Sequence, residues 1–138
     1  MTRINKRMAE IIYKKLSYKV NGACFRTQNA LGRYRSHGQY LDKLEPEIVE
    51  LGLTCSREVP LPPSFESEKE GRNIPDLIVE GEEGKLVIEV KVKRLLTKDD
   101  YFQLQRYLVS GNFRLGLLVN FRQHVLKPKR IINAEYKI

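Results

Sequence analysis

The chain has 138 residues, of which 41% are hydrophobic and 30% are charged, and this composition is typical of a globular protein with one hydrophobic core. It contains no apolar run approaching the roughly 20 residues of a membrane-spanning helix, and its basic N-terminus lacks the apolar segment of a secretory signal. The net charge is +8, with 25 Lys and Arg against 17 Asp and Glu, which favours nucleic acid as a partner over a merely solvated basic surface.

The first half of the chain has apolar residues at helical spacing. We predict one helix over Asn5–Leu16 and a second over Lys19–Leu31, with Ser17 as the cap of the second. A third helix is predicted over Gln39–Leu51. We expect a kink or a restart at Pro46, because proline lacks the backbone N–H of a helical residue.

The second half reads mainly as strands. Five segments have strand patterns: 54–62, Ile74–Glu80, Lys85–Lys93, 113–121 and 125–132. A capping box at Thr97 and Asp100 predicts one helix running to Ser110, and the polar segment 64–73 predicts an exposed loop. The resulting order, three helices, three strands, a helix and two strands, predicts an α/β or α+β fold with a central mixed β-sheet flanked by helices.

Three charged residues interrupt the apolar hairpin: Asp76, Glu89 and Lys91. Because strand side chains alternate between faces, Glu89 and Lys91 project from the same face. If Asp76 lies on the adjacent strand near Glu89, the two carboxylates converge and repel each other unless a cation lies between them or one is protonated. Mg²⁺ or Mn²⁺ suits such oxygen ligands. The alternative is that Glu89 and Lys91 form a surface pair and Asp76 is a turn acid.

These residues resemble the PD-(D/E)xK motif of a nuclease superfamily, with Pro75-Asp76 followed by Glu89-Val90-Lys91. Gln103 and Tyr107, four residues apart on the next helix, resemble the Q-x-x-x-Y element of the recombination-exonuclease branch. A longer series of blocks resembles the small stand-alone GxxExxY branch over about residues 18–133: VNGACFRTQNALG, LGL, REVPLP, IPDLIV, VIEVKV, QLQRYL, LGLLVNF and KPKRIIN.

The resemblance implies one nuclease-like domain, 1–138. Its core would be restriction-endonuclease-like, with a sheet-containing part at about 54–133 and an N-terminal helical segment at about 5–51. It also implies metal-dependent hydrolysis of phosphodiester bonds in nucleic acid, with DNA as the expected substrate. Many small members of the superfamily are dimers, so a homodimer is compatible with this reading.

The resemblance assigns roles to individual residues. Asp76 and Glu89, with the carbonyl of Val90, would hold Mg²⁺ or Mn²⁺, and Lys91 would orient or deprotonate the attacking water or stabilise charge on the phosphate. Gln103 and Tyr107 would steady the site or contact the nucleic acid. Further phosphate contacts are expected from four basic residues: Arg33, Arg35, Lys93 and Arg106.

One departure from the GxxExxY signature leaves alternatives open. Aligned up to Tyr40, the signature Gly falls on Tyr34 and the signature Glu falls on His37. His37 could coordinate Mn²⁺ or a softer ion, position a phosphate, or mark weakened metal binding. Asp42 or Glu45, one or two turns further on, could substitute for the missing acid.

Two rival functions follow from the same residues. His37 favours a nuclease-fold module that binds nucleic acid or a protein partner and has lost catalysis. The acid pair on an apolar hairpin favours an enzyme, because buried charges are costly. Hydrolysis of another phosphorylated substrate is a third reading.

Cys24 and Cys55 are too few for a disulfide framework, so we expect reduced thiols and a cytoplasmic protein.

Overall fold

A five-stranded mixed sheet, ordered β1-β2-β3-β4-β5, lies at the centre of residues 11–138, the part of the chain that the computed structural model describes. The strands are β1 (Thr54–Arg57), β2 (Leu77–Gly81), β3 (Gly84–Lys91), β4 (Leu115–Asn120) and β5 (Lys129–Ile132). Neighbouring strands are antiparallel except β3 and β4, which are parallel.

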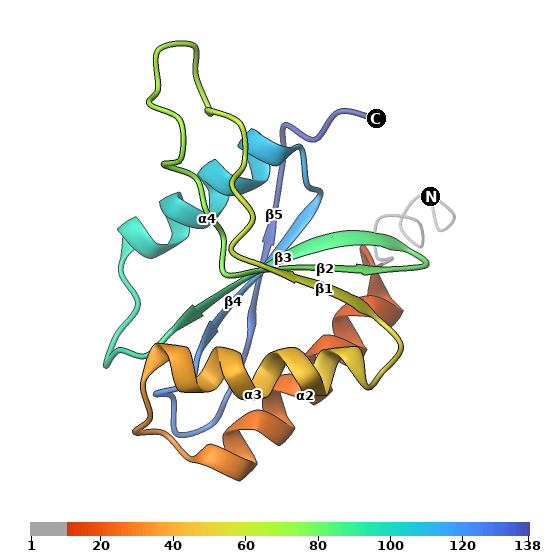
Figure 1. Ribbon diagram of the computed structural model, residues 1–138, viewed down its shortest axis with the longest axis vertical. Coiled ribbons are helices and arrows are strands. Elements are labelled where there is room, and N and C mark those ends of the chain that lie inside the picture. The colour runs from red at the N-terminus through yellow and green to blue at the C-terminus, as the bar shows by residue number, and fades with distance from the viewer. Residues whose placement is uncertain (1–10) are drawn as a thin grey trace, which may run out of the picture.

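Three helices in this part of the chain flank the sheet: α2 (Lys14–Leu31), α3 (His37–Val49) and α4 (Lys98–Gly111). Helices α2 and α3 cover one face, and α4, the crossover between the parallel strands, covers the other (Figure 1). This arrangement confirms the predicted α/β fold with a central mixed sheet flanked by helices. None of the helices among residues 11–138 is long and apolar enough to cross a membrane.

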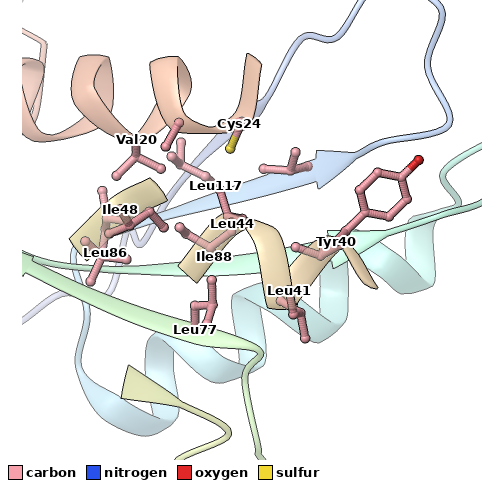
Figure 2. Packing of buried hydrophobic residues seen from close by; sticks show 14 of the residues in the cluster. Val20, Cys24, Tyr40, Leu41, Leu44, Ile48, Leu77, Leu86, Ile88 and Leu117 are labelled. Carbon is pink, nitrogen blue, oxygen red and sulfur yellow. The ribbon is translucent and has the colours of Figure 1, made fainter. Parts of the chain in front are cut away.

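Alternation along β3 divides the hydrophobic core into two clusters. Leu86, Ile88 and Val90 belong to the larger cluster, under α2 and α3, whereas Val87 belongs to the cluster under α4. Figure 2 shows residues of α2, α3 and the sheet interdigitating in the larger cluster, including Tyr40, which is fully buried. Glu89 and Lys91 lie two and four residues after Val87, so their side chains project from the same face of β3 as Val87, toward α4.

The predicted break at Ser17 is wrong, because α2 runs through it without interruption. Ser17 is buried, and its hydroxyl accepts a hydrogen bond from the Arg130 guanidinium at 2.8 Å. The first turn of α2 is instead capped by Glu83 from the β2–β3 turn, whose carboxylate accepts the Leu16 N–H at 2.7 Å. Residues 5–10 of the predicted first helix lie outside the described residues.

Helix α3 begins two residues earlier than predicted, at His37. Ser36 and Gln39 form a capping box there, which satisfies backbone N–H groups that the first turn cannot pair internally. We predicted a kink or a restart at Pro46; the helix continues through Pro46 to Val49, so the restart does not occur. The early start matters because it makes His37 the first helical residue instead of a turn residue.

The strands are shorter than predicted. β1 ends at Arg57 because Glu58 adopts a left-handed conformation, with φ of 54°. β2 begins at Leu77, three residues later than expected, and the last strand begins only after Pro128. The capping box at Thr97 is confirmed, although the left-handed residue that ends α4 is Asn112 and the helix includes Gly111.

Candidate active site

A cavity of about 530 Å³ opens at the end of the sheet where strand β2 begins and strand β3 ends. Its walls come from the start of α3, the segment before β2, the end of β3 and the inner face of α4. The cavity brings together eight residues predicted from the sequence: Arg35, His37, Asp76, Glu89, Val90, Lys91, Gln103 and Tyr107. Ser36, Ile74 and Val92, which the sequence did not single out, complete the walls.

The strand register places the two acids opposite each other. Leu77 of β2 pairs with Ile88 of β3, so Asp76, one residue before β2, meets Glu89. The Asp76 N–H donates to Oε1 of Glu89 at 2.7 Å, and the Val90 N–H donates to Oδ2 of Asp76 at 2.7 Å. Each carboxylate is therefore fixed by a backbone group of the neighbouring segment, which leaves Oδ1 of Asp76 and Oε2 of Glu89 as the oxygens best placed to serve a cation.

Glu89 is only 4% exposed. Burial, followed by the neighbouring Asp76 charge, raises the pKa of its carboxyl from the ordinary 4.5 to about 8, although the hydrogen bond from the Asp76 N–H and the Lys91 charge oppose the shift. The protein thus holds two acids where ionising both is unfavourable. A divalent cation would stabilise the doubly ionised form, and carboxylate oxygens are the ligands that hard cations prefer.

The acid pair alone is not a complete metal site. Across residues 11–138, no group of three or more His, Cys, Asp or Glu side chains is arranged to hold a metal ion. A bound ion would therefore need other oxygens, from the backbone, water or substrate. Such a partly open coordination shell is typical of catalytic metal sites.

Lys91 extends into the cavity toward α4. Its Nζ donates to Oε1 of Gln103 at 2.7 Å and lies 3.7 Å from Oε2 of Glu89. Gln103 and Tyr107 are one helical turn apart, and both line the cavity. Burial, followed by the nearby Glu89 charge, raises the pKa of the Tyr107 hydroxyl to about 12, so this group stays protonated at neutral pH.

His37 reaches the acid pair from the first position of α3. Its Nε2 lies 3.0 Å from Oδ2 of Asp76, and its side chain is 48% exposed. The loop before α3 is held by the buried Tyr40, which donates its hydroxyl proton to the Gly32 carbonyl and stacks on Phe121 with ring centroids 4.4 Å apart. His37, which the resemblance aligned with the signature Glu, therefore lies at the acid pair.

Asp100 has a role that the sequence did not reveal. Besides capping α4, its Oδ2 accepts a hydrogen bond from Nζ of Lys93 at 2.9 Å, and its Oδ1 lies 3.8 Å from Nζ of Lys91. Burial raises the pKa of Asp100, but the Thr97 N–H and the two lysines outweigh this effect and lower it overall. The capping box alone accounts for an acid at position 100, so nothing in the sequence indicated that Asp100 also contacts Lys91 and Lys93.

The predicted phosphate contacts separate into two groups. Arg35 lines the cavity. The other three do not line it: Lys93, Arg33 and Arg106. Lys93 is paired with Asp100. The Nε–H of Arg33 donates to the Arg122 carbonyl at 2.9 Å, and the Nε–H of Arg106 donates to the Asn73 side chain at 3.0 Å. Nucleic-acid binding by these residues stays a prediction.

Comparison with protein families gives one match. A family model described as PD-(D/E)XK nuclease superfamily matches residues 14–132. No curated protein and no solved structure matched the chain. The matched region spans every helix and strand described above and all the walls of the cavity.

Proposed function

The chain belongs to the PD-(D/E)XK nuclease superfamily, and on that basis we propose that it is a metal-dependent nuclease that hydrolyses phosphodiester bonds, with DNA as its substrate. The observation that carries this proposal is the pairing of Asp76 with Glu89 in the cavity, beside Lys91. A buried acid pair without a cation is unfavourable. Its placement in an open cavity supports a catalytic purpose over a structural one.

The superfamily generally uses divalent metals, and the donor set here fits one. Asp76 and Glu89, with the Val90 carbonyl, would hold Mg²⁺ or Mn²⁺, and the bound ion would polarise the phosphodiester and lower the pKa of a coordinated water. The hydrogen bond between His37 and Asp76 supports a positioning role for the imidazole. Direct coordination through Nε2, the other reading of His37, would require that nitrogen to be deprotonated and to bind the ion instead of donating to Asp76.

The remaining cavity residues act on the substrate and the water. Lys91, held by Gln103 and drawn toward Glu89, would orient the attacking water or stabilise the negative charge that develops on the phosphate. Tyr107 stays protonated, so it can donate a hydrogen bond but cannot serve as a base near neutral pH. Arg35, which lines the cavity, would contact a substrate phosphate.

Three finer assignments belong to the same proposal. The order of sequence blocks supports membership of the GxxExxY branch, with Tyr40 as its signature tyrosine. Cys24 and Cys55 are free thiols in the structure, and this supports a reducing, cytoplasmic location. A homodimer would extend the surface that a small domain offers to a duplex.

The test is cleavage of circular single-stranded DNA and of plasmid DNA with Mg²⁺ or Mn²⁺, with linear substrates to detect exonuclease action. Wild type should be compared with Glu89→Ala and Lys91→Ala. Lys85→Ala is the matched control, because Lys85 is exposed at the other end of β3. We expect cleavage that requires metal, is lost in both cavity variants and is retained in the control.

Absence of cleavage on every substrate, with metal-independent DNA binding intact, would refute the enzyme. That result would leave the binding module as the function and would make His37 the position where catalysis was lost. Cleavage that survives in both cavity variants would show that the activity comes from elsewhere or from a contaminant.

A further inference from the structure

Two arginines meet on one exposed tyrosine beside the candidate active site. The guanidinium carbon of Arg33 lies 5.4 Å from the centre of the Tyr34 ring, and that of Arg122 lies 5.0 Å from it. Tyr34 is 72% exposed. We propose that Arg33, Tyr34 and Arg122 form a phosphate-binding site, distinct from the catalytic cavity, for the backbone of the nucleic acid; this inference rests on the proposed function.

The charge balance at this cluster calls for an anion. Both arginines are half-buried, yet neither forms an ion pair within residues 11–138. Apart from the bond from the Arg33 Nε–H to the Arg122 carbonyl, the guanidinium groups find no hydrogen-bond acceptor in the described part of the chain. Two half-buried cations over one ring, without an acidic partner in the described part of the chain, form a positive site that an anionic ligand would stabilise. A phosphate, which accepts several N–H groups at once, matches planar guanidinium donors.

The cluster is built before any ligand arrives. The bond from Arg33 Nε to the Arg122 carbonyl ties the α2–α3 loop to the β4–β5 loop, and the two loops lie side by side in Figure 1. Gln28 adds two further links, from Nε2 to the carbonyls of Phe121 and Gln123, at 3.0 and 2.8 Å. Because these contacts fix the backbone on both sides, binding would order little of the chain, which favours affinity.

The position of the cluster identifies which phosphate it would hold. Tyr34 immediately precedes Arg35, which lines the catalytic cavity. On the other side, the Arg122 N–H donates to the Asn120 side chain, and Asn120 pairs with Lys91 in the parallel ladder. The cluster therefore borders the cavity without entering it. It would hold a phosphate that flanks the scissile one on the same nucleic acid and so contribute to binding without taking part in bond cleavage.

Tyr34 is the residue that the resemblance aligns with the Gly of the GxxExxY signature. The role of its ring would be to hold two like charges in place through cation–π contacts. The two guanidinium groups, rather than the ring, would make the contacts to the phosphate.

The experiment measures binding of a fluorescein-labelled 20-nucleotide single-stranded DNA by anisotropy, in EDTA and across a series of salt concentrations. The principal variant is Arg122→Gln, which keeps the backbone carbonyl that Arg33 uses. The matched control is Arg114→Gln. Arg114 also lies over a tyrosine, Tyr136 at 6.0 Å, but it precedes β4 at the far end of the strand from the cavity.

For Arg122→Gln we expect affinity to fall roughly 5- to 10-fold at moderate salt and the slope of log K against log salt to fall by about 1. Arg114→Gln should stay within about twofold of wild type. Tyr34→Leu keeps both charges, so it should weaken binding by a smaller factor with little change in slope. Thermal unfolding of each variant checks that it is folded.

If wild type binds and cleaves DNA but Arg122→Gln and Tyr34→Leu behave like Arg114→Gln, the phosphate site is wrong while the proposed nuclease stands. If wild type neither binds nor cleaves nucleic acid, both proposals fail together. An affinity loss in Arg122→Gln with an unchanged salt slope would also overturn the site, because removing a phosphate contact must release fewer counterions.

Discussion

Replacing Glu89 with Gln should stabilise the metal-free protein by an amount that increases with pH. Glu89 is buried beside Asp76, and its pKa is raised from 4.5 to about 8. Gln is nearly isosteric, and its carbonyl oxygen can still accept the Asp76 N–H that Oε1 of Glu89 now accepts. The substitution therefore removes an unfavourable buried charge and keeps the hydrogen bond.

The sign and size follow from proton linkage. A carboxyl whose pKa is higher in the folded than in the unfolded state binds its proton more tightly when folded, so folding loses stability as pH rises from about 4.5 to about 8. The loss is at most about 1.4 kcal/mol per pH unit. At pH 7 the difference between Glu89→Gln and wild type should reach about 3 kcal/mol, or an increase in Tm of about 10 °C for a chain of this size. At pH 4.5 the difference should be close to zero.

The assay is urea unfolding in EDTA, followed by circular dichroism, at half-unit steps from pH 4.5 to 8. The control is Glu80→Gln, which removes the same charge from an exposed position on β2. We expect the free energy of unfolding of Glu89→Gln to rise relative to both wild type and the control as pH increases. A constant difference across this range, or a loss of stability in Glu89→Gln at pH 7, would mean that burial beside Asp76 does not raise the pKa of Glu89.

Three further predictions concern the site and its support. Mg²⁺ or Mn²⁺ at tenfold excess over its Kd should stabilise wild type by about 1.4 kcal/mol at pH 7.5, measured by thermal unfolding, and should leave the stability of Glu89→Gln unchanged. Equal increases in Tm for the two proteins would place the ion elsewhere. Gln103→Ala should slow DNA cleavage by on the order of 10- to 100-fold, because Lys91 loses its acceptor at 2.7 Å, whereas Gln105→Ala, exposed on α4, should cleave normally. Tyr40→Phe should lower the free energy of unfolding by about 1–2 kcal/mol in urea, since the Gly32 carbonyl loses its donor; no loss would mean that the hydroxyl does not hold the loop.

The sequence predicted the structure best where the pattern is local, as in the alternation of side chains along a strand or the capping of a helix. Alternation along β3 predicted that Glu89 projects from the face opposite Ile88, and the division of the core confirms it. The capping box at Thr97 is likewise a local signal and marks the start of α4 correctly. The order of elements then sufficed for the fold, because a mixed sheet covered by helices is one of few ways to bury these faces.

The features that the sequence missed depend on contacts between distant segments. Ser17 resembles a helix cap locally, but a hydrogen bond from Arg130, 113 residues away, accommodates it inside α2. The same limit applies to the Arg122 guanidinium, which meets Tyr34 only because the β4–β5 loop folds against the α2–α3 loop. Neither pairing leaves a periodic pattern in the chain.

We propose that Asp76 and Glu89 form the metal site of a nuclease, and nicking of supercoiled plasmid by wild type and Glu89→Gln with Mn²⁺ at pH 7.5 tests this proposal. We expect wild type to nick the plasmid and EDTA to abolish this activity. We expect Glu89→Gln, although the more stable protein without metal, not to nick. Nicking by Glu89→Gln at the wild-type rate would rule out the site, because the residue that holds the ion would then be dispensable.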